Sequence, residues 1–328
     1  MAIDCWRQVA GWLESVYHFA MAHVELVQVR TADGVRLDGA LSVPKHGDSK
    51  HAASHQNADD KAAAQLAGDA HHGAVDAVLA IHGTGSNFYA ATVLEGLTPK
   101  LLADGMTVLR ANTRGHDAVS MAATLHGPRR LGSSFEIVDE CRHDIVAWCE
   151  FLTSRGCKSI ALLGHSLGAI KSIYSVTHQP HPAVTRLIAI SPPRLSHQYY
   201  LESEKREEFA AQYKLAQEHV AAGKGDTLST ITTPLPFLVS AKSFLDKYGP
   251  DEKYNFLRYL NAIKLPTVFV FGGVELEEVN FRGLTEAVAA GISPGQKIDA
   301  ITIDGANHVY TGRIDELAFK IRTWLAKS

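Results

Sequence analysis

The stretch Ile160–Ala169, which reads IALLGHSLGA, decides the fold. Four apolar residues typical of a buried strand lead directly into Gly-x-Ser-x-Gly, and an apolar helical run continues from Ala169 to His178. Between a strand and a helix, this pentapeptide predicts a nucleophile elbow, a strained turn in which two glycines allow close approach of chain segments. We therefore expect Ser166 to project above a sheet as a nucleophile, next to a helix N-terminus that favours a developing oxyanion.

Around this stretch, apolar runs typical of strands alternate with helical segments, which predicts the α/β class with a parallel sheet covered on both faces. The runs are Val75–Ile81, Met106–Ala111, Ser159–Leu163, Thr185–Ile190, Pro266–Phe271 and Ile298–Ile303. The clearest helices are Phe135–Ser154 and Ile314–Leu325. Two earlier β-branched runs, Val24–Arg30 and Val35–Val43, flank an Asp-Gly turn and predict an antiparallel hairpin. The expected sheet is thus mostly parallel and eight-stranded.

One interval breaks this rhythm and is predicted to be a lid over the site. Residues 191–262 contain a charged helical stretch, Leu201–Ala222, and a Pro-rich segment, Thr233–Phe237, but no obvious strand of the main sheet. The catalytic core is then 24–190 together with 263–328. Aromatic residues of the interval either line the site or simply pack together, and both interpretations stay open: Tyr199, Tyr200, Phe209, Tyr213, Phe237, Phe244, Tyr248 and Tyr254.

Two further segments stand outside the core. Residues 1–23 have apolar residues at helical spacing interrupted by charges, which predicts an amphipathic helix packed on the domain or on the second subunit of a homodimer, with a membrane-surface anchor as the alternative. The pattern fits neither a signal peptide nor a spanning helix. Residues 45–73 are polar and poor in large apolar residues, and we expect a mobile surface insertion whose histidines lack a tight metal-ligand spacing.

The composition predicts an ordinary globular protein that acts on a small molecule. The 328 residues are 46% hydrophobic and 20% charged, with a net charge of −3, which gives no electrostatic footprint for nucleic acid. The four cysteines show neither a metal-ligand spacing nor the density of a disulfide scaffold: Cys5, Cys141, Cys149 and Cys157. We expect reduced thiols in a cytoplasm, and no metal or cofactor.

A second glycine-rich turn follows the apolar run that ends at Ile81. It reads HGTGSN over His82–Asn87, and in an HG-type turn a backbone N–H lies opposite the nucleophile elbow. The expected oxyanion donors are the amides of Thr84 and Leu167. A glycine-rich turn into a helix is the plain alternative, and a phosphate loop would need a lysine that this stretch lacks. His82 is predicted to be structural, because the general base comes late in the chain.

Serine needs a general base that a carboxylate holds in one tautomer, and in this architecture the chain order is serine, acid, histidine. Among seventeen histidines, His308 alone follows the last strand, within Gly-Ala-Asn-His, and precedes the C-terminal helix, so we expect it to be the base. Glu275 follows the strand before, 33 residues upstream of His308, and is the expected acid. Close alternatives are Glu277 and Glu278, followed by Asp246 or Asp251 in the interval.

These motifs, in this order, resemble the α/β-hydrolase superfamily from Val24 onward, and the resemblance implies the α/β-hydrolase fold. Glu275 stands in a Gly-x-x-Asp frame in which relatives more often carry aspartate. Thr113–His116 looks like the RGH turn common in the superfamily, where it is usually structural. The block His82–Tyr89 resembles uncharacterised bacterial relatives and, more distantly, fungal siderophore esterases, which implies ester cleavage.

The expected reaction is hydrolysis of a carboxylic ester through an acyl-enzyme on Ser166. Thioesters, lactones and amides could use the same groups, as could an acyltransferase that excludes water. A dehalogenase would need an aspartate nucleophile. A receptor without activity is the alternative from another class. Arg129 and Arg130, in the loop His126–Gly132, could bind a substrate carboxylate, although solvated surface arginines are the simpler interpretation.

Overall fold

The computed structural model describes residues 23–44 and 74–328. The predicted N-terminal helix, apart from His23, and the predicted insertion 45–73 lie outside the described residues. Cys5 lies outside them as well, whereas Cys141, Cys149 and Cys157 are buried free thiols. Everything below concerns the described part of the chain.

The predicted eight-stranded sheet is confirmed, with the order β1-β2-β4-β3-β7-β8-β11-β12. β2 runs antiparallel to both β1 and β4, and the other neighbours are parallel. The strands are β1 His23–Arg30, β2 Arg36–Val43, β3 Ala77–Ile81, β4 Thr107–Ala111, β7 Ile160–His165, β8 Val184–Ile190, β11 Thr267–Gly272 and β12 Ile298–Ile303. Each lies within two residues of its predicted bounds, and the carboxyl ends of β3, β7, β8, β11 and β12 meet at one edge.

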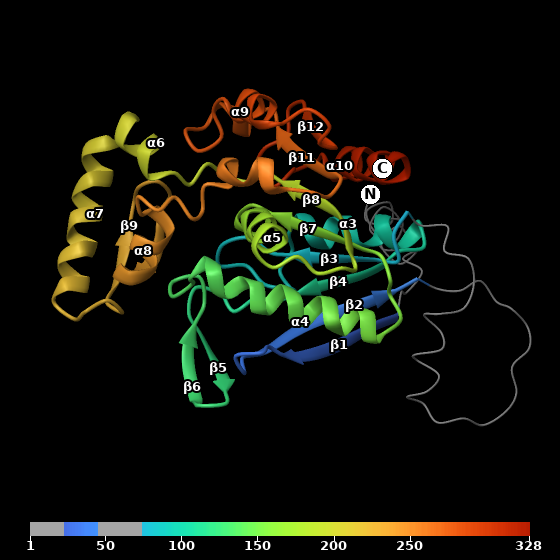
Figure 1. Ribbon diagram of the computed structural model, residues 1–328, viewed down its shortest axis with the longest axis horizontal. Helices are drawn as coiled ribbons and strands as arrows, with labels where there is room; N and C mark the ends of the chain where they lie inside the picture. The colour runs from blue at the N-terminus through green and yellow to red at the C-terminus, as the bar shows by residue number, and fades with distance from the viewer. Residues whose placement is uncertain (1–22, 45–73) are drawn as a thin grey trace, which may run out of the picture.

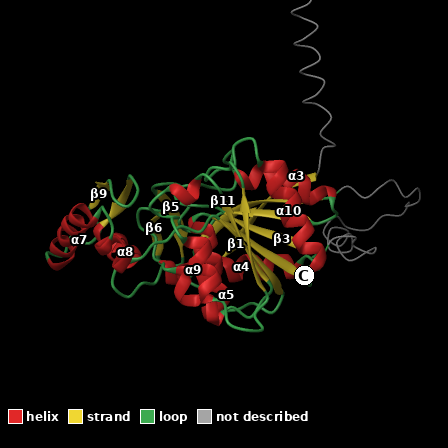
Figure 2. Ribbon diagram, turned by 90° about the horizontal axis from the view of Figure 1, so that it is seen from above, coloured by secondary structure: helices red, strands yellow, loops and turns green. Residues whose placement is uncertain are grey.

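Helices cover both faces of this sheet, as predicted (Figure 2). Helices α3 Val93–Ala103 and α10 Ile314–Lys327 pack on one face, and helices α4 Cys141–Ser154, α5 Leu167–His178 and α9 Leu284–Gly291 pack on the other. Side chains of the central strands alternate between the two faces. In β3, Val78 and Ala80 pack in the apolar cluster with α3 and α10, whereas Leu79 and Ile81 pack in the cluster with α4, α5 and α9. Strands buried on both faces explain why the central runs are continuously apolar.

Arg114, in the turn after β4, connects helix α4 with the turn between β1 and β2. Arg114 is fully buried and donates from Nε and Nη2 to Asp144 Oδ1 at 2.9 and 2.8 Å. It also donates to Asp33, in the Asp-Gly turn between β1 and β2, at 2.7 and 2.9 Å. Glu140 is a third carboxylate partner, at 3.2 Å from Arg114 Nη1. The buried guanidinium holds these segments in place, so the RGH turn has a structural role here.

The segment predicted as a loop around Arg129 and Arg130 is a strand. β5 Ser120–Thr124 and β6 Gly127–Leu131 form an antiparallel hairpin that projects from the body (Figure 1). Arg129 pairs with Glu140 at 2.8 Å, and the guanidinium of Arg130 lies 5.3 Å from the centre of the Phe135 ring. The pattern was hidden because Pro-Arg-Arg has no apolar alternation, and cross-strand pairing decides the conformation instead.

Most of the elements in residues 191–262 lie together at one end of the molecule (Figure 1). They are α6 His197–Glu202, α7 Arg206–Ala221, β9 Leu228–Ile231, β10 Phe237–Ser240 and α8 Ala241–Tyr248. The 3₁₀ helix η2 Phe256–Ala262 packs on the core instead, where the Phe256 ring stacks on Phe269 of β11 with 5.6 Å between the ring centres. β9 and β10 pair only with each other. The aromatic residues of this group stack on one another, with Phe209 contacting the rings of Tyr200, Tyr213, Phe244 and Tyr248, so most of them pack together.

The helix predicted from Phe135 begins six residues later, at Cys141, after the 3₁₀ turn η1 Val138–Glu140. The intervening backbone is bound to the 191–262 group instead. Ser240 N donates to Ser134 O at 2.8 Å, and Val138 N donates to Asp246 Oδ2 at 3.1 Å. These tertiary hydrogen bonds outweigh the local helix propensity of the segment.

Candidate functional site

Ser166 occupies a strained turn at the end of β7, as the elbow motif predicts. Its φ of 57° and ψ of −125° lie in a region that non-glycine residues rarely adopt. Its backbone N–H donates to Ile190 O, at the end of β8, at 2.8 Å. The serine side chain is half-buried, and the surrounding structure holds a conformation that the local chain would avoid.

The two glycines of the elbow are required by contact distances. A Cβ on Gly164 would lie 2.3 Å from Gly168 O, and a Cβ on Gly168 would lie 2.2 Å from Ile81 O and 2.6 Å from His82 O. Real Cβ atoms do not approach that closely. The first contact closes the turn on itself, and the second presses α5 against the start of the His82–Asn87 turn.

The predicted oxyanion amides belong to these two touching segments. A Cβ on Gly83 would lie 3.1 Å from Ser166 Cβ and 3.5 Å from Ser166 Oγ, so the Gly83–Thr84 peptide lies beside the serine. Leu167 follows Ser166 at the first position of α5. Within residues 23–44 and 74–328, neither Thr84 N–H nor Leu167 N–H donates a hydrogen bond to another protein group. Two unpaired amides beside a serine hydroxyl are able to bind a negative oxygen.

The structure brings His308 and Glu275 together across the loops after β12 and β11. His308 Nδ1 lies 2.8 Å from Glu275 Oε2. Glu275 is fully buried, at 0% exposure, whereas the His308 side chain is 31% exposed and reaches the surface of the site. The geometry matches a carboxylate that holds an imidazole in one tautomer.

The alternative acids lie elsewhere. Glu277 and Glu278 are exposed, and neither hydrogen-bonds to His308. Asp246 accepts from Lys253 Nζ at 2.8 Å and from Val138 N at 3.1 Å, and Asp251 is exposed. Burial together with contact to the histidine distinguishes Glu275 from its neighbours.

Three residues that the sequence analysis missed complete the surroundings of Glu275. Ser191 Oγ donates to Glu275 Oε1 at 2.6 Å, and Gly272 N donates to the same oxygen at 2.7 Å. Tyr310 OH lies 2.9 Å from Ser191 Oγ, and burial, followed by the charge of Glu275, raises the pKa of this phenol. The position of Ser191 directly after β8, at the carboxyl edge of the sheet, was the one available signal.

His165 supports the loop that carries His308. Its Nε2 lies 2.8 Å from His308 O, and the centres of the two rings are 4.9 Å apart. Burial, followed by the neighbouring His308, lowers the pKa of His165 to about 3. His165 is therefore neutral at ordinary pH, and its Nε2–H donates to the His308 carbonyl.

No hydrogen bond joins Ser166 Oγ to the His308 ring among the described residues. Serine–histidine hydrogen bonds are often long in free enzymes and tighten when a substrate is bound. The arrangement therefore consists of a formed acid–base pair, a strained serine and two unpaired amides at one edge of the sheet.

No group of three His, Cys, Asp or Glu side chains in the described ranges could hold a metal ion. None of the helices in 23–44 and 74–328 has both the length and the apolar character to cross a bilayer.

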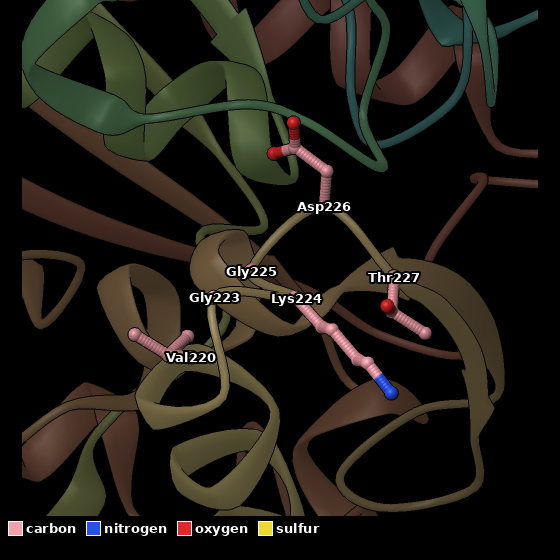
Figure 3. Close-up of a pocket in the computed structure, with 6 residues that line it drawn as sticks. All are labelled: Val220, Gly223, Lys224, Gly225, Asp226 and Thr227. Atoms are coloured by element: carbon pink, nitrogen blue, oxygen red, sulfur yellow. The ribbon is translucent and has the colours of Figure 1, made fainter.

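A hollow of about 450 Å³ lies in the turn between α7 and β9 (Figure 3). Val220 and residues 223–227 line it, and none of the predicted site residues is among them. The side chains of Lys224 and Asp226 point away from each other in Figure 3. It is thus separate from the candidate site.

The fold and the strand-end arrangement define a protein of the α/β-hydrolase class. A family model described as the alpha/beta hydrolase family matches residues 78–312, and the chain belongs to that family. No curated protein matches the chain in sequence.

Solved structures show the same fold at low identity. The α/β hydrolase GrgF from Penicillium sp. sh18 is 13% identical, with a TM-score of 0.65, over 93% of this chain and 98% of its own. A soluble variant of monoglyceride lipase from Saccharomyces cerevisiae is 14% identical, with a TM-score of 0.61, over 95% and 97%. Est1E from Butyrivibrio proteoclasticus, solved with ferulic acid bound, is 14% identical, with a TM-score of 0.58, over 92% and 98%.

Proposed function

We propose that this protein hydrolyses a carboxylic ester through an acyl-enzyme formed on Ser166, with His308 as general base and Glu275 as the acid. The observation that carries the proposal is the 2.8 Å contact between His308 Nδ1 and buried Glu275, at the sheet edge that also holds the strained serine. A buried carboxylate bound to a partly exposed imidazole near a strained serine is the arrangement that nucleophilic catalysis requires.

The mechanism follows from the roles of these groups. Ser166 Oγ attacks the ester carbon while His308 Nε2 takes its proton, and Glu275 stabilises the imidazolium that forms. The carbonyl oxygen becomes negative and is held by the amides of Thr84 and Leu167. His308 then returns the proton to the leaving alkoxide. A water molecule repeats the sequence on the acyl-enzyme, which releases the carboxylic acid and restores Ser166.

An ester is favoured over other acyl substrates by the structural neighbours, which include an esterase and a monoglyceride lipase. Lactones, thioesters and acyl transfer use the same groups, and no feature of the described residues favours one of them. We further propose that 191–262 is a lid that selects the substrate. The position of α6 to α8 at one end of the molecule, with Ser240 and Asp246 hydrogen-bonded to Ser134 and Val138, supports this assignment.

The test is a pre-steady-state assay with p-nitrophenyl acetate, followed by labelling with a fluorophosphonate. We expect a burst of p-nitrophenol equal to the enzyme concentration, and a single label on Ser166 by peptide mass spectrometry. A panel of esters, lactones and thioesters then identifies the preferred acyl bond. Folded protein that gives neither burst nor label would leave the non-catalytic receptor as the better assignment.

A further inference from the structure

The peptide unit between Gly83 and Thr84 is held from behind by a histidine side chain. His82 Nδ1 lies 2.8 Å from Gly83 O. That carbonyl belongs to the same peptide unit as Thr84 N–H, one of the two amides assigned to the oxyanion. Because a trans peptide is planar, its C=O and N–H point in opposite directions. A hydrogen bond on the carbonyl therefore sets where the N–H points.

The proton on the His82 ring can be assigned from an unambiguous donor. Thr113 N–H donates to His82 Nε2 at 3.1 Å, so Nε2 carries no proton. Nδ1 of a neutral imidazole must then carry it, and Nδ1–H donates to Gly83 O. This tautomer is the one that holds the peptide unit.

A buried ion pair behind the ring keeps it neutral. Lys171 Nζ donates to Glu136 Oε1 at 2.9 Å and to Thr113 Oγ1 at 2.8 Å, and the Thr113 hydroxyl lies 3.2 Å from His82 Nε2. Both charged side chains are at most 1% exposed. Burial, followed by the charge of Lys171, holds the pKa of His82 well below its usual range. A proton on Nε2 would be repelled by the two Thr113 donors, its N–H and its hydroxyl, and by the charge of Lys171.

We propose that His82 is a positioning residue of the esterase site: its Nδ1–H aims Thr84 N–H at the developing oxyanion. The inference rests on the proposed function and adds to it a residue that never touches the substrate. A preorganised donor is useful because it needs no reorganisation when charge develops. Without the restraint, the Gly83–Thr84 peptide can rotate, since Gly83 tolerates many backbone conformations.

The chain offers a matched pair of variants. In His82→Asn, the side-chain amide can place an N–H where Nδ1 stands, and the acceptor for Thr113 N–H is lost. In His82→Gln, the amide reaches the position of Nε2, and the donor to Gly83 O is lost. His82→Leu removes both. Comparing the three variants separates the effect of the Nδ1–H donor from the effects of the Nε2 acceptor and of the packing of the ring.

The expected kinetics with p-nitrophenyl acetate follow from the loss of one aligned oxyanion donor. His82→Gln and His82→Leu should lose about 10²-fold in kcat with KM within about threefold, and His82→Asn should stay within about fivefold of the parent. Melting temperatures should rank differently, because Asn and Leu both leave the buried Thr113 N–H without its acceptor. His82→Gln should therefore lose mainly kcat, His82→Asn mainly thermal stability, and His82→Leu both.

A second readout uses binding alone. A trifluoromethyl ketone adds to the serine and places an oxyanion in the hole, whereas the free carboxylic acid product does not. His82→Gln should weaken ketone inhibition by about the same factor as kcat and leave product inhibition unchanged, as expected for an interaction made only in the transition state. A purely structural role would weaken both ligands alike.

The outcomes are distinguishable. If fluorophosphonate fails to label Ser166 in the parent protein, the proposed function fails and the inference falls with it. If the parent is labelled but His82→Gln keeps full kcat, or if Asn loses as much as Gln, the inference is overturned while the esterase assignment stands. Should His82→Leu not fold, the comparison of Asn with Gln still decides.

Discussion

The strand-end core and the 191–262 group are built by different kinds of interaction. In the core, backbone contacts place the site: Ser166 N on Ile190 O, Gly168 against Ile81 O, and Gly272 N on Glu275. In the 191–262 group, aromatic side chains packed on one another, such as Phe209 on Tyr248, do most of the holding. Contacts that involve the backbone fix the positions of the core residues closely, whereas the packing of aromatic side chains can be altered by substituting them. If the proposed function and the proposed lid are correct, substitutions in the first region should change the chemistry and those in the second should change selectivity.

The largest effect should come from the nucleophile. Ser166→Ala should lower kcat by about 10⁴-fold or more, because no other group can form the acyl-enzyme. Loss of p-nitrophenyl acetate turnover and of fluorophosphonate labelling is the measurement. Ser172→Ala, on the same helix, is the control and should keep activity. Labelling of a different serine in active protein would remove the assignment.

The acid should rank next. Glu275→Gln should lower kcat by about 10³- to 10⁴-fold, because the amide no longer stabilises the imidazolium and favours the wrong tautomer. Glu277→Gln and Glu278→Gln, which change exposed residues close to Glu275 in sequence, should change kcat by less than about twofold. If either of those is the more damaging change, the acid moves to that residue and the mechanism is unaffected.

Shortening the 191–262 group tests whether it affects selectivity without affecting the chemistry. Replacing 206–227 with a Gly/Ser linker of about eight residues removes α7 but keeps Tyr248 and Tyr254, which pack in the same apolar cluster as the core. Hydrolysis of a small acetate should stay within about tenfold, while kcat/KM for the preferred bulky ester should fall by about 10²-fold or more. Cooperative thermal unfolding is the control for folding. Equal loss on both substrates would mean that the segment contributes to the chemistry.

A smaller effect on kcat is expected from Ser191, which hydrogen-bonds to Glu275. Ser191→Ala removes one of the hydrogen bonds to Glu275 and should lower kcat by about tenfold with KM unchanged, in line with a hydrogen bond to a charged group. Tyr310→Phe touches Glu275 only through Ser191 and should cost less. The opposite ranking would show that the phenol, and not the serine, positions the carboxylate.

The smallest effect concerns stability against pH. His165 is neutral when folded, with a pKa of about 3, and titrates near 6.5 when unfolded. At His165 the unfolded chain therefore binds more protons between these values, so the contribution of this residue to stability is constant above about pH 6.5 and falls as the pH drops below it, by on the order of 1 kcal/mol per pH unit. Buried His82 acts in the same direction. His165→Gln should flatten the slope between about pH 6 and 4.5 in urea denaturation. The exposed His126→Asn should not change it.

The sequence was sufficient where the signal is local and insufficient where distant residues meet. Ser166, Glu275 and His308 each lie within five residues of the end of a strand. β7 and β11 are recognisable in the sequence because both of their faces are buried, and β12 because of its β-branched residues. Ser191 meets Glu275 across 84 residues and Tyr310 across 119, and a lone Ser or Tyr carries no pattern that announces such a contact. The start of α4 was missed for the same reason, since its flanking backbone bonds to residues far along the chain.

The contact of Gly168 with Ile81 O has a consequence for how activity arises during folding. β3 and β7 are neighbours in the sheet but far apart in sequence, and such non-local pairings form slowly because loop closure comes first. The oxyanion turn and the elbow meet only when that pairing is complete. Recovered turnover after dilution from denaturant should thus lag behind the recovery of helical circular dichroism. The time at which turnover recovers would then report when β3 and β7 pair.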